Sequence, residues 1–272
     1  SYKSGDFTPY LYKTEDYGKT WTTITKGIPN EHFTRVLRED PAVKGLLYAG
    51  TENGMYVSYN DGASWEAFQN NLPIVPITDL TIKDNSLIVA TQGRSLWMVD
   101  DLTVLHQLLA DEKSNTKTAR LFDPKDAYRT KGRGGRSSLT AGTNLPNGVI
   151  THFYLPEGME KDSVVLHYHN AAGEVLASYS NKAKERSKKL PLDKGANTFV
   201  WDTRGTGAER LDGMILWWAN LDGPKAVPGA YKVSMSVGDQ TIATHDFSIL
   251  PDPRAEASVA DMQAQYDFIS KV

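Results

Sequence analysis

The stretch SYNDGASW, residues 58–65, decides the fold, and TEDYGKTW, residues 14–21, repeats its pattern. Both octets read Ser/Thr, any residue, Asp/Asn, any residue, Gly, any residue, Ser/Thr, Trp. Their final residues, Trp21 and Trp65, are separated by 44 positions (65 − 21). The spacing therefore predicts a structural repeat, and the first question is whether the octet is a turn, a ligand site or a catalytic site.

The order of residues within each octet predicts a β-hairpin turn. The side chain of Asp16 or Asn60 is expected to accept hydrogen bonds from the backbone N–H groups that follow it. Gly18 and Gly62 supply the positive φ that such a turn requires. The octets therefore favour a structural role.

The other positions that the two octets share also have structural tasks. Hydroxyl groups are expected to tie the strand ends together at Thr14, Thr20, Ser58 and Ser64. Trp21 and Trp65 are expected to bury their rings between neighbouring sheets, each hiding roughly 150–250 Å². No octet residue offers a general acid or base with a partner, so we expect no catalytic residue there.

The residues around the second octet predict four short strands, at 34–39, 45–51, 54–60 and 64–69. Four strands in about 40 residues are typical of one β-propeller blade, and such blades repeat at this spacing. Three further strands are expected at 77–84, 86–93 and 95–102. Residues 1–109 are thus predicted to form the last, incomplete set of blades, and the remaining blades would come from the same protein or from another chain.

Beyond residue 109 the repeat disappears. Residues 110–252 begin with a polar linker and a glycine-rich loop at 131–148, and then alternate as six strands at 149–156, 163–170, 174–180, 196–203, 229–238 and 240–250. This pattern predicts a β-sandwich of immunoglobulin or fibronectin type. Residues 253–272 change to a helical period, with Ser258 near the N-cap of a short helix. The fold class is therefore all-β with a C-terminal helix.

The composition limits the classes of function. The chain has 272 residues, no cysteine and a formal net charge of −3. We therefore expect no disulfide, no nucleic-acid partner and no membrane span, and no motif for a cofactor is found. The sequence begins without a signal-peptide pattern, so any export signal is expected to have been removed.

The octets resemble the Asp-box of bacterial neuraminidases, which also occurs in sialidases and in the sortilin receptors. The stretches LLYAGTENGMYVSYNDGASW (46–65) and ATQGRSLWMVDDL (90–102) resemble the last blades of bacterial sortilin-like propeller proteins, often labelled glycosyl hydrolase with BNR repeats. The stretch GMILWWANLDGPKAVPGAYKVSMSVG (213–238) resembles the sandwich that follows the propeller in these exported bacterial proteins. The resemblance implies an Asp-box on the propeller rim, away from the ligand site.

The sequence assigns no catalytic set of a sialidase or a glycosidase. A sialidase needs three arginines around the substrate carboxylate, but Arg35 and Arg38 fall on the predicted strand 34–39 and Arg94 falls far from them, so no assignment follows. A glycosidase needs two carboxylates that face one cleft, whereas Asp100 and Asp101 are consecutive strand residues that point to opposite faces. They are expected to end the strand and bind the backbone of the turn.

Two other groups are candidates for binding. His167 and His169 share one face of a predicted strand and His152 lies on a nearby strand, which is compatible with a zinc or nickel site or with cross-strand packing. Trp217 and Trp218, with Trp201 and Tyr231 nearby in the sequence, form either a platform for sugars or a docking surface, and docking is favoured.

The sequence thus favours a non-catalytic binding or scaffold portion of an exported sortilin-like propeller protein, with a surface for a peptide, a protein or a glycan. The alternative is a fragment of a glycoside hydrolase whose catalytic residues lie mostly on other blades. A purely structural role in a cell-surface assembly is the third possibility.

Overall fold

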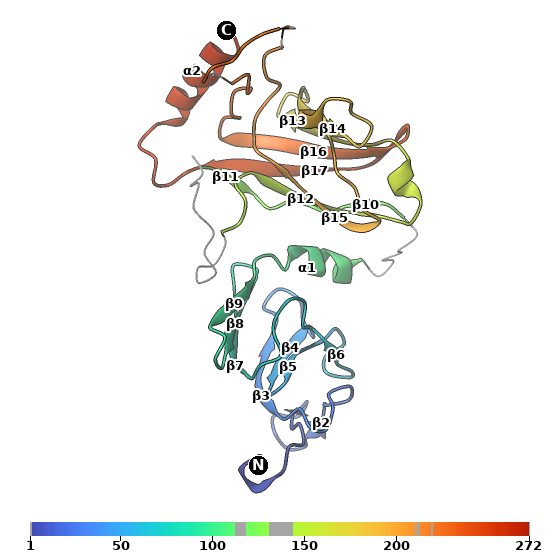
Figure 1. Ribbon diagram of the computed structural model, residues 1–272. Coiled ribbons are helices and arrows are strands. Elements are labelled where there is room, and N and C mark those ends of the chain that lie inside the picture. Colours follow the sequence, from blue (N-terminus) through green and yellow to red (C-terminus); the bar gives the residue numbers. More distant parts are fainter. Residues whose placement is uncertain are drawn as a thin grey trace. The chain divides into compact units, whose positions relative to one another are not determined.

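The structure is a computed structural model and describes residues 2–111, 118–130, 144–209, 211, 213–218 and 220–271 (Figure 1). Their regular secondary structure is mostly β-strand. The chain divides into two compact units, residues 1–114 and 115–272. The predicted linker after residue 110 and the predicted loop at 131–148 lie largely outside the described residues.

The described residues of the first unit begin with a short 3-10 helix, η1 (Tyr2–Ser4), and contain three antiparallel sheets. A two-stranded sheet joins β1 (Tyr12–Lys13) to β2 (Thr22–Thr23). A four-stranded sheet has its strands in sequence order, β3 (Thr34–Glu39), β4 (Leu47–Thr51), β5 (Gly54–Ser58) and β6 (Glu66–Ala67). A three-stranded sheet follows, again in sequence order, with β7 (Ile77–Lys83), β8 (Ser86–Thr91) and β9 (Leu96–Val99).

The central strands β4 and β5 are buried on both faces, and the sequence pattern explains this. Successive strand residues point to opposite sides. Tyr48 and Val57 belong to a core that also receives Ile77 and Leu80 of the next sheet. Leu47, Ala49 and Tyr56 point the other way, into a second core with Leu11, Ile28 and Trp65 of the neighbouring segments. The uninterrupted apolar character of these strands follows from this double coverage.

Helix α1 (Thr103–Ala110) was not predicted from the sequence. It begins where a third octet would follow β9, just as the second octet follows β5. Asp101 Oδ1 accepts hydrogen bonds from the backbone N–H of Thr103 at 2.8 Å and from its hydroxyl at 2.6 Å. Leu102, Leu105 and Leu109 pack against the core shared by the four- and three-stranded sheets. The repeat therefore ends in a helix.

The second unit contains two sheets (Figure 1). One has three strands in the order β10 (Arg120–Leu121), β12 (Val149–Leu155) and β15 (Gly195–Trp201). The other has five, in the order β11 (Ala127–Arg129), β17 (Gln240–Pro251), β16 (Gly229–Val237), β13 (Val164–Asn170) and β14 (Val175–Ser180). Strand β11 pairs in parallel with β17, and the other neighbours are antiparallel. Short 3-10 helices η2 (Met159–Lys161) and η3 (Arg186–Lys188) lie in the connections.

The two sheets of this unit bury one core between them. Phe153 of the three-stranded sheet and Leu166 of the five-stranded sheet belong to the same buried cluster. At its centre the ring of Tyr168 stacks on Trp201, with 4.5 Å between centroids, and neither ring is accessible to solvent. Strand β12 alternates strictly between buried and half-buried residues, which is typical of a sheet with one covered face.

The C-terminal helix was predicted and is present as α2 (Val259–Ile269). Ser258 is its N-cap, and the Ser258 hydroxyl and the Asp261 carboxylate exchange hydrogen bonds with each other's backbone N–H groups. In the described residues, neither α-helix is long and apolar enough to cross a membrane.

Candidate functional site

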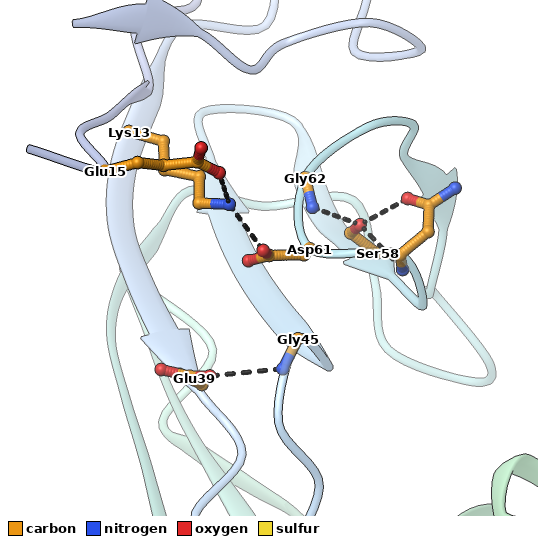
Figure 2. Close-up of polar contacts among 8 residues, drawn as sticks. Lys13, Glu15, Glu39, Gly45, Ser58, Asp61 and Gly62 are labelled. Atoms are coloured by element: carbon orange, nitrogen blue, oxygen red, sulfur yellow. Dashed lines mark hydrogen bonds and ion pairs between the residues drawn. The ribbon is translucent and has the colours of Figure 1, made fainter. Parts of the chain in front are cut away.

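The second octet forms the turn between β5 and β6 (Figure 2). Ser58 Oγ accepts a hydrogen bond from Gly62 N at 2.9 Å and donates one to Asn60 Oδ1 at 3.0 Å. Asn60 Oδ1 also accepts from Ser64 N at 2.9 Å, and Asn60 Nδ2 donates to Ser64 Oγ at 2.9 Å. Gly62 has a φ of 84°. The three polar side chains of the pattern thus hold the turn, as the sequence predicted.

The first octet repeats this geometry between β1 and β2. Thr14 Oγ1 accepts from Gly18 N at 2.8 Å and donates to Asp16 Oδ1 at 2.9 Å. Asp16 accepts from the backbone N–H of Thr20 at 2.8 Å and from its hydroxyl at 2.7 Å. These bonds, the backbone bond first, lower the pKa of Asp16. A general acid would need the opposite shift, so the carboxylate is suited to hold the turn and not to donate a proton.

The two tryptophans of the octets have different environments. Trp65 is 3% exposed, and its indole N–H donates to Ile24 O at 2.6 Å. Trp21 is 60% exposed, so the prediction that both rings are buried is wrong for Trp21. The reason is that Trp65 is covered by the segment at 24–28, which leaves the preceding hairpin, and no described segment covers Trp21 in the same way.

An ion pair also connects the two hairpins (Figure 2). Lys13 Nζ of the first hairpin lies 2.5 Å from Asp61 Oδ2 of the second octet and 2.8 Å from Glu15 Oε1. The hydrogen bonds to Asp61 and then to Glu15 raise the pKa of Lys13. In the same region Glu39 Oε1 accepts from Gly45 N at 3.1 Å. These contacts fix neighbouring turns and leave no free pair of carboxylates for catalysis among the residues drawn.

The histidine candidates are divided between the two sheets of the second unit. His167 and His169 lie on the outer face of β13, with 6.0 Å between their ring centroids. His152 lies on the outer face of β12, in the other sheet, where Nδ1 is 2.9 Å from Thr198 Oγ1. Because both sheets turn their inner faces to one core, the three rings do not converge. No group of three or more potential metal ligands is found among the described residues.

The arginine candidates do not converge either. Arg35 Nη2 lies 2.5 Å from Glu52 Oε2, and Arg38 Nη2 lies 2.6 Å from Asp79 Oδ1. Arg94 Nη1 donates to the carbonyl of Gly93 at 3.3 Å. Each guanidinium therefore has its own local partner.

The aromatic candidates separate into buried and exposed residues. Trp217 and Trp218 are 86% and 98% exposed. Trp201 and Tyr231, which the sequence placed with them, are instead core residues of the second unit. A platform of four aromatic rings is therefore excluded, and only the adjacent pair Trp217 and Trp218 is available to a partner.

The second unit has a surface cavity of about 870 Å³ that the sequence did not predict. It lies between β14, η3 and the segments at 202–209 and 221–223. The segment at 202–209 is held in place by backbone hydrogen bonds from Thr206 N to Leu176 O and from Ala208 N to Leu221 O, both at 3.0 Å. The charged and aromatic residues of its lining include Tyr179, Glu185, Lys188, Asp202, Arg204 and Asp222.

Several charges in this cavity have partners of opposite sign or backbone acceptors. Arg204 Nε lies 3.9 Å from a carboxylate oxygen of both Asp202 and Asp222, and Nη1 donates to Gly223 O at 2.8 Å. The hydroxyl of Ser187 and then Lys188 lower the pKa of Glu185. Burial, and then the charge of Asp202, raise the pKa of Tyr179 to about 12. The cavity thus presents the Glu185 carboxylate, further acidic and basic side chains and the neutral phenol of Tyr179, which suits hydrogen bonding to a polar ligand.

A second feature missed by the sequence is a buried polar cluster in the first unit. Asp40 is 3% exposed, and its Oδ2 lies 2.8 Å from His106 Nε2 of α1 and 3.2 Å from the hydroxyl of Tyr48. Burial opposes the ionisation of Asp40, but hydrogen bonds from the N–H of Ala42 and from His106 outweigh it and lower the pKa. The cluster anchors α1. Its members are 66 residues apart, so no local pattern could reveal it.

Comparison with known proteins identifies no family. No family model and no curated protein matches the chain. Among solved structures, the extracellular domain of a putative one-component system from B. thetaiotaomicron is 12% identical, with a TM-score of 0.28 over 89% of this chain and 28% of that one. The extracellular domain of a putative hybrid two-component system from the same organism is 11% identical, with a TM-score of 0.28 over 90% and 29%. The chain thus spans less than a third of these structures.

Proposed function

We propose that the chain is a non-catalytic binding or scaffold portion of an exported, sortilin-like Asp-box propeller protein. In this proposal the first unit is the final set of propeller blades and the second is a β-sandwich of immunoglobulin or fibronectin type. The ligand is a peptide, a protein or a glycan. The strand orders support it: the four-stranded sheet runs β3-β4-β5-β6 and the next runs β7-β8-β9.

The observation that carries the proposal is the hydrogen bonding of the octets. The carboxylate of Asp16 and the amide of Asn60 occupy equivalent positions and make equivalent bonds to the backbone. A catalytic carboxylate would not be interchangeable with an amide, because an amide cannot exchange a proton with a substrate. The turn tolerates both since it requires only an acceptor.

The cavity at Arg204 is the surface that we assign to the ligand. Its volume falls within the usual 300–1,000 Å³ of ligand sites, with charged groups of both signs and the half-buried ring of Tyr179. The glycoside hydrolase alternative would need a carboxyl group with a raised pKa. The lowered pKa of Glu185 points away from that role.

Binding without turnover tests the proposal. The native protein should bind members of a glycan or peptide array, and the variant Asp222→Asn should lose affinity at least fivefold. The matched control is Asp246→Asn, which makes the same charge change on β17, outside the cavity lining. Equal affinities of the two variants would show that the cavity is not the ligand site. Saturable release of a chromophore from glycosides would contradict the non-catalytic proposal and favour the glycoside hydrolase alternative.

A further inference from the structure

The 44-residue offset extends beyond the octets and makes an internal comparison possible. It pairs Tyr12 with Tyr56 and Trp21 with Trp65. In the second copy both rings are buried, at 7% and 3% exposed. In the first copy the same residue types at the same positions are 51% and 60% exposed. Residue type and turn geometry are equal, so the difference must come from what packs against each copy.

The second copy is covered by the segment at 24–28. The indole N–H of Trp65 donates to Ile24 O at 2.6 Å, and the backbone N–H of Trp65 donates to Lys26 O at 2.9 Å. The approach is so close that a methyl group at Gly27 would lie 2.2 Å from Trp65 O. A methyl group at Gly62 would lie 2.7 Å from Ile24 Cδ1. An aliphatic side chain, two carbonyl groups and a glycine therefore make up the cover.

The first copy has none of this cover among the described residues. A methyl group at Gly18 would meet only the ring of Trp21, at 3.7 Å. Tyr17 is fully exposed. Its counterpart in the second octet, Asp61, instead forms an ion pair with Lys13 of the preceding hairpin. We call Tyr12, Tyr17 and Trp21 the Trp21 face. Its three aromatic rings lie around a turn whose counterpart is an interface.

In the part of the chain that the structure describes, the segments related to 24–28 by the offset are not available to cover the Trp21 face. The segment at 24–28 is occupied by Trp65. Its own counterpart, 44 residues later, is the segment at 68–72, and Phe68 and Leu72 pack into the core with Tyr48. Both of these described segments are therefore already engaged.

We propose that the Trp21 face is an interface for one further copy of the same repeat, which contributes a segment with the chemistry of residues 24–28. The occupant supplies an aliphatic side chain over Gly18, a carbonyl group that accepts the indole N–H of Trp21 and a glycine opposite the carbonyl of Trp21. The inference rests on one part of the proposed function, namely that copies of the repeat pack side by side.

Covalent labelling of tryptophan in two samples tests the proposal. The 272-residue chain and the native protein from its source are oxidised with N-bromosuccinimide, and the labelled peptides are quantified by mass spectrometry. In the 272-residue chain Trp21 should react at least tenfold faster than the buried Trp65. In the native protein both should be protected to within about twofold of each other. Trp21 that stays fast in the native protein would overturn the proposal.

A photo-cross-linker identifies the occupant. Benzoylphenylalanine placed at Tyr17 in the native protein should yield a cross-linked peptide that follows a Ser/Thr-Trp pair and contains an aliphatic residue three positions before a glycine. Cross-linking to a sequence without this pattern would overturn the proposal even if Trp21 is protected. The glycoside and array assays are independent of this result, so the two proposals can fail separately.

Discussion

The replacement Trp65→Ala should destabilise the first unit far more than Trp21→Ala. Trp65 is 3% exposed, so nearly all of its roughly 200 Å² is removed from water, which at about 25 cal/mol per Å² corresponds to about 5 kcal/mol. Alanine retains part of this contribution, but the carbonyl of Ile24 loses its donor. We expect a loss of about 4 kcal/mol, within the range for large-to-small core substitutions.

Trp21→Ala is the matched control, because it makes the same change at the same repeat position. Trp21 is 60% exposed, so about two fifths of its surface is hidden and the loss should be at most about 2 kcal/mol. Hydrogen exchange of the β4 and β5 amides, measured by mass spectrometry, reports the stability of this unit separately from the second one. Equal losses for the two variants would refute the reasoning, since they would mean that the segment at 24–28 contributes nothing.

Three further predictions concern the first unit. The pKa of Asp40 in the folded protein is below its unfolded value of about 3.9. The carboxylate therefore stabilises the fold above that pH, and this stabilisation is lost as the pH falls through the folded pKa. Acid unfolding of Asp40→Asn, followed by circular dichroism, should lack this part of the transition. Gly27→Ala should lower the free energy of unfolding, measured in urea, by about 2 kcal/mol or more, because φ of Gly27 is 104° and the methyl group would collide with Trp65 O. An unchanged free energy of unfolding would contradict the close approach. Strand β9 is the edge of its sheet, has no described partner there, and exposes Leu96 and Met98. The isolated chain should therefore self-associate on size exclusion, and replacement of both residues by lysine should make it monomeric. A monomeric parent chain would count against an open edge.

The local structure could be predicted well from the sequence. The octets specify their own turns, since each acceptor lies within four residues of its donor. The strands β3, β7 and β12 begin and end within one residue of the expected ranges. Ser258 could be identified as an N-cap because capping is a local interaction.

Features that depend on distant segments could not be predicted. The difference in exposure between Trp21 and Trp65 depends on the segment at 24–28, which packs against Trp65 and lies more than 30 positions before it in the sequence. The cavity at Arg204 joins residues from 177 to 223, and the cluster at Asp40 joins residues 66 positions apart. Helix α1 was missed for a different reason: Leu102, Leu105 and Leu109 have helical spacing, but eight residues after a strand repeat give a weak signal.

The central claim is that the octets are architectural turns in a protein that binds its ligand without cleaving it. Its most direct test is the rate of chromophore release when the native protein is incubated with a panel of chromogenic glycosides. The account predicts rates indistinguishable from those in buffer. Saturable release that is abolished by Asp16→Asn would contradict it, because the amide at the equivalent Asn60 already holds the second turn.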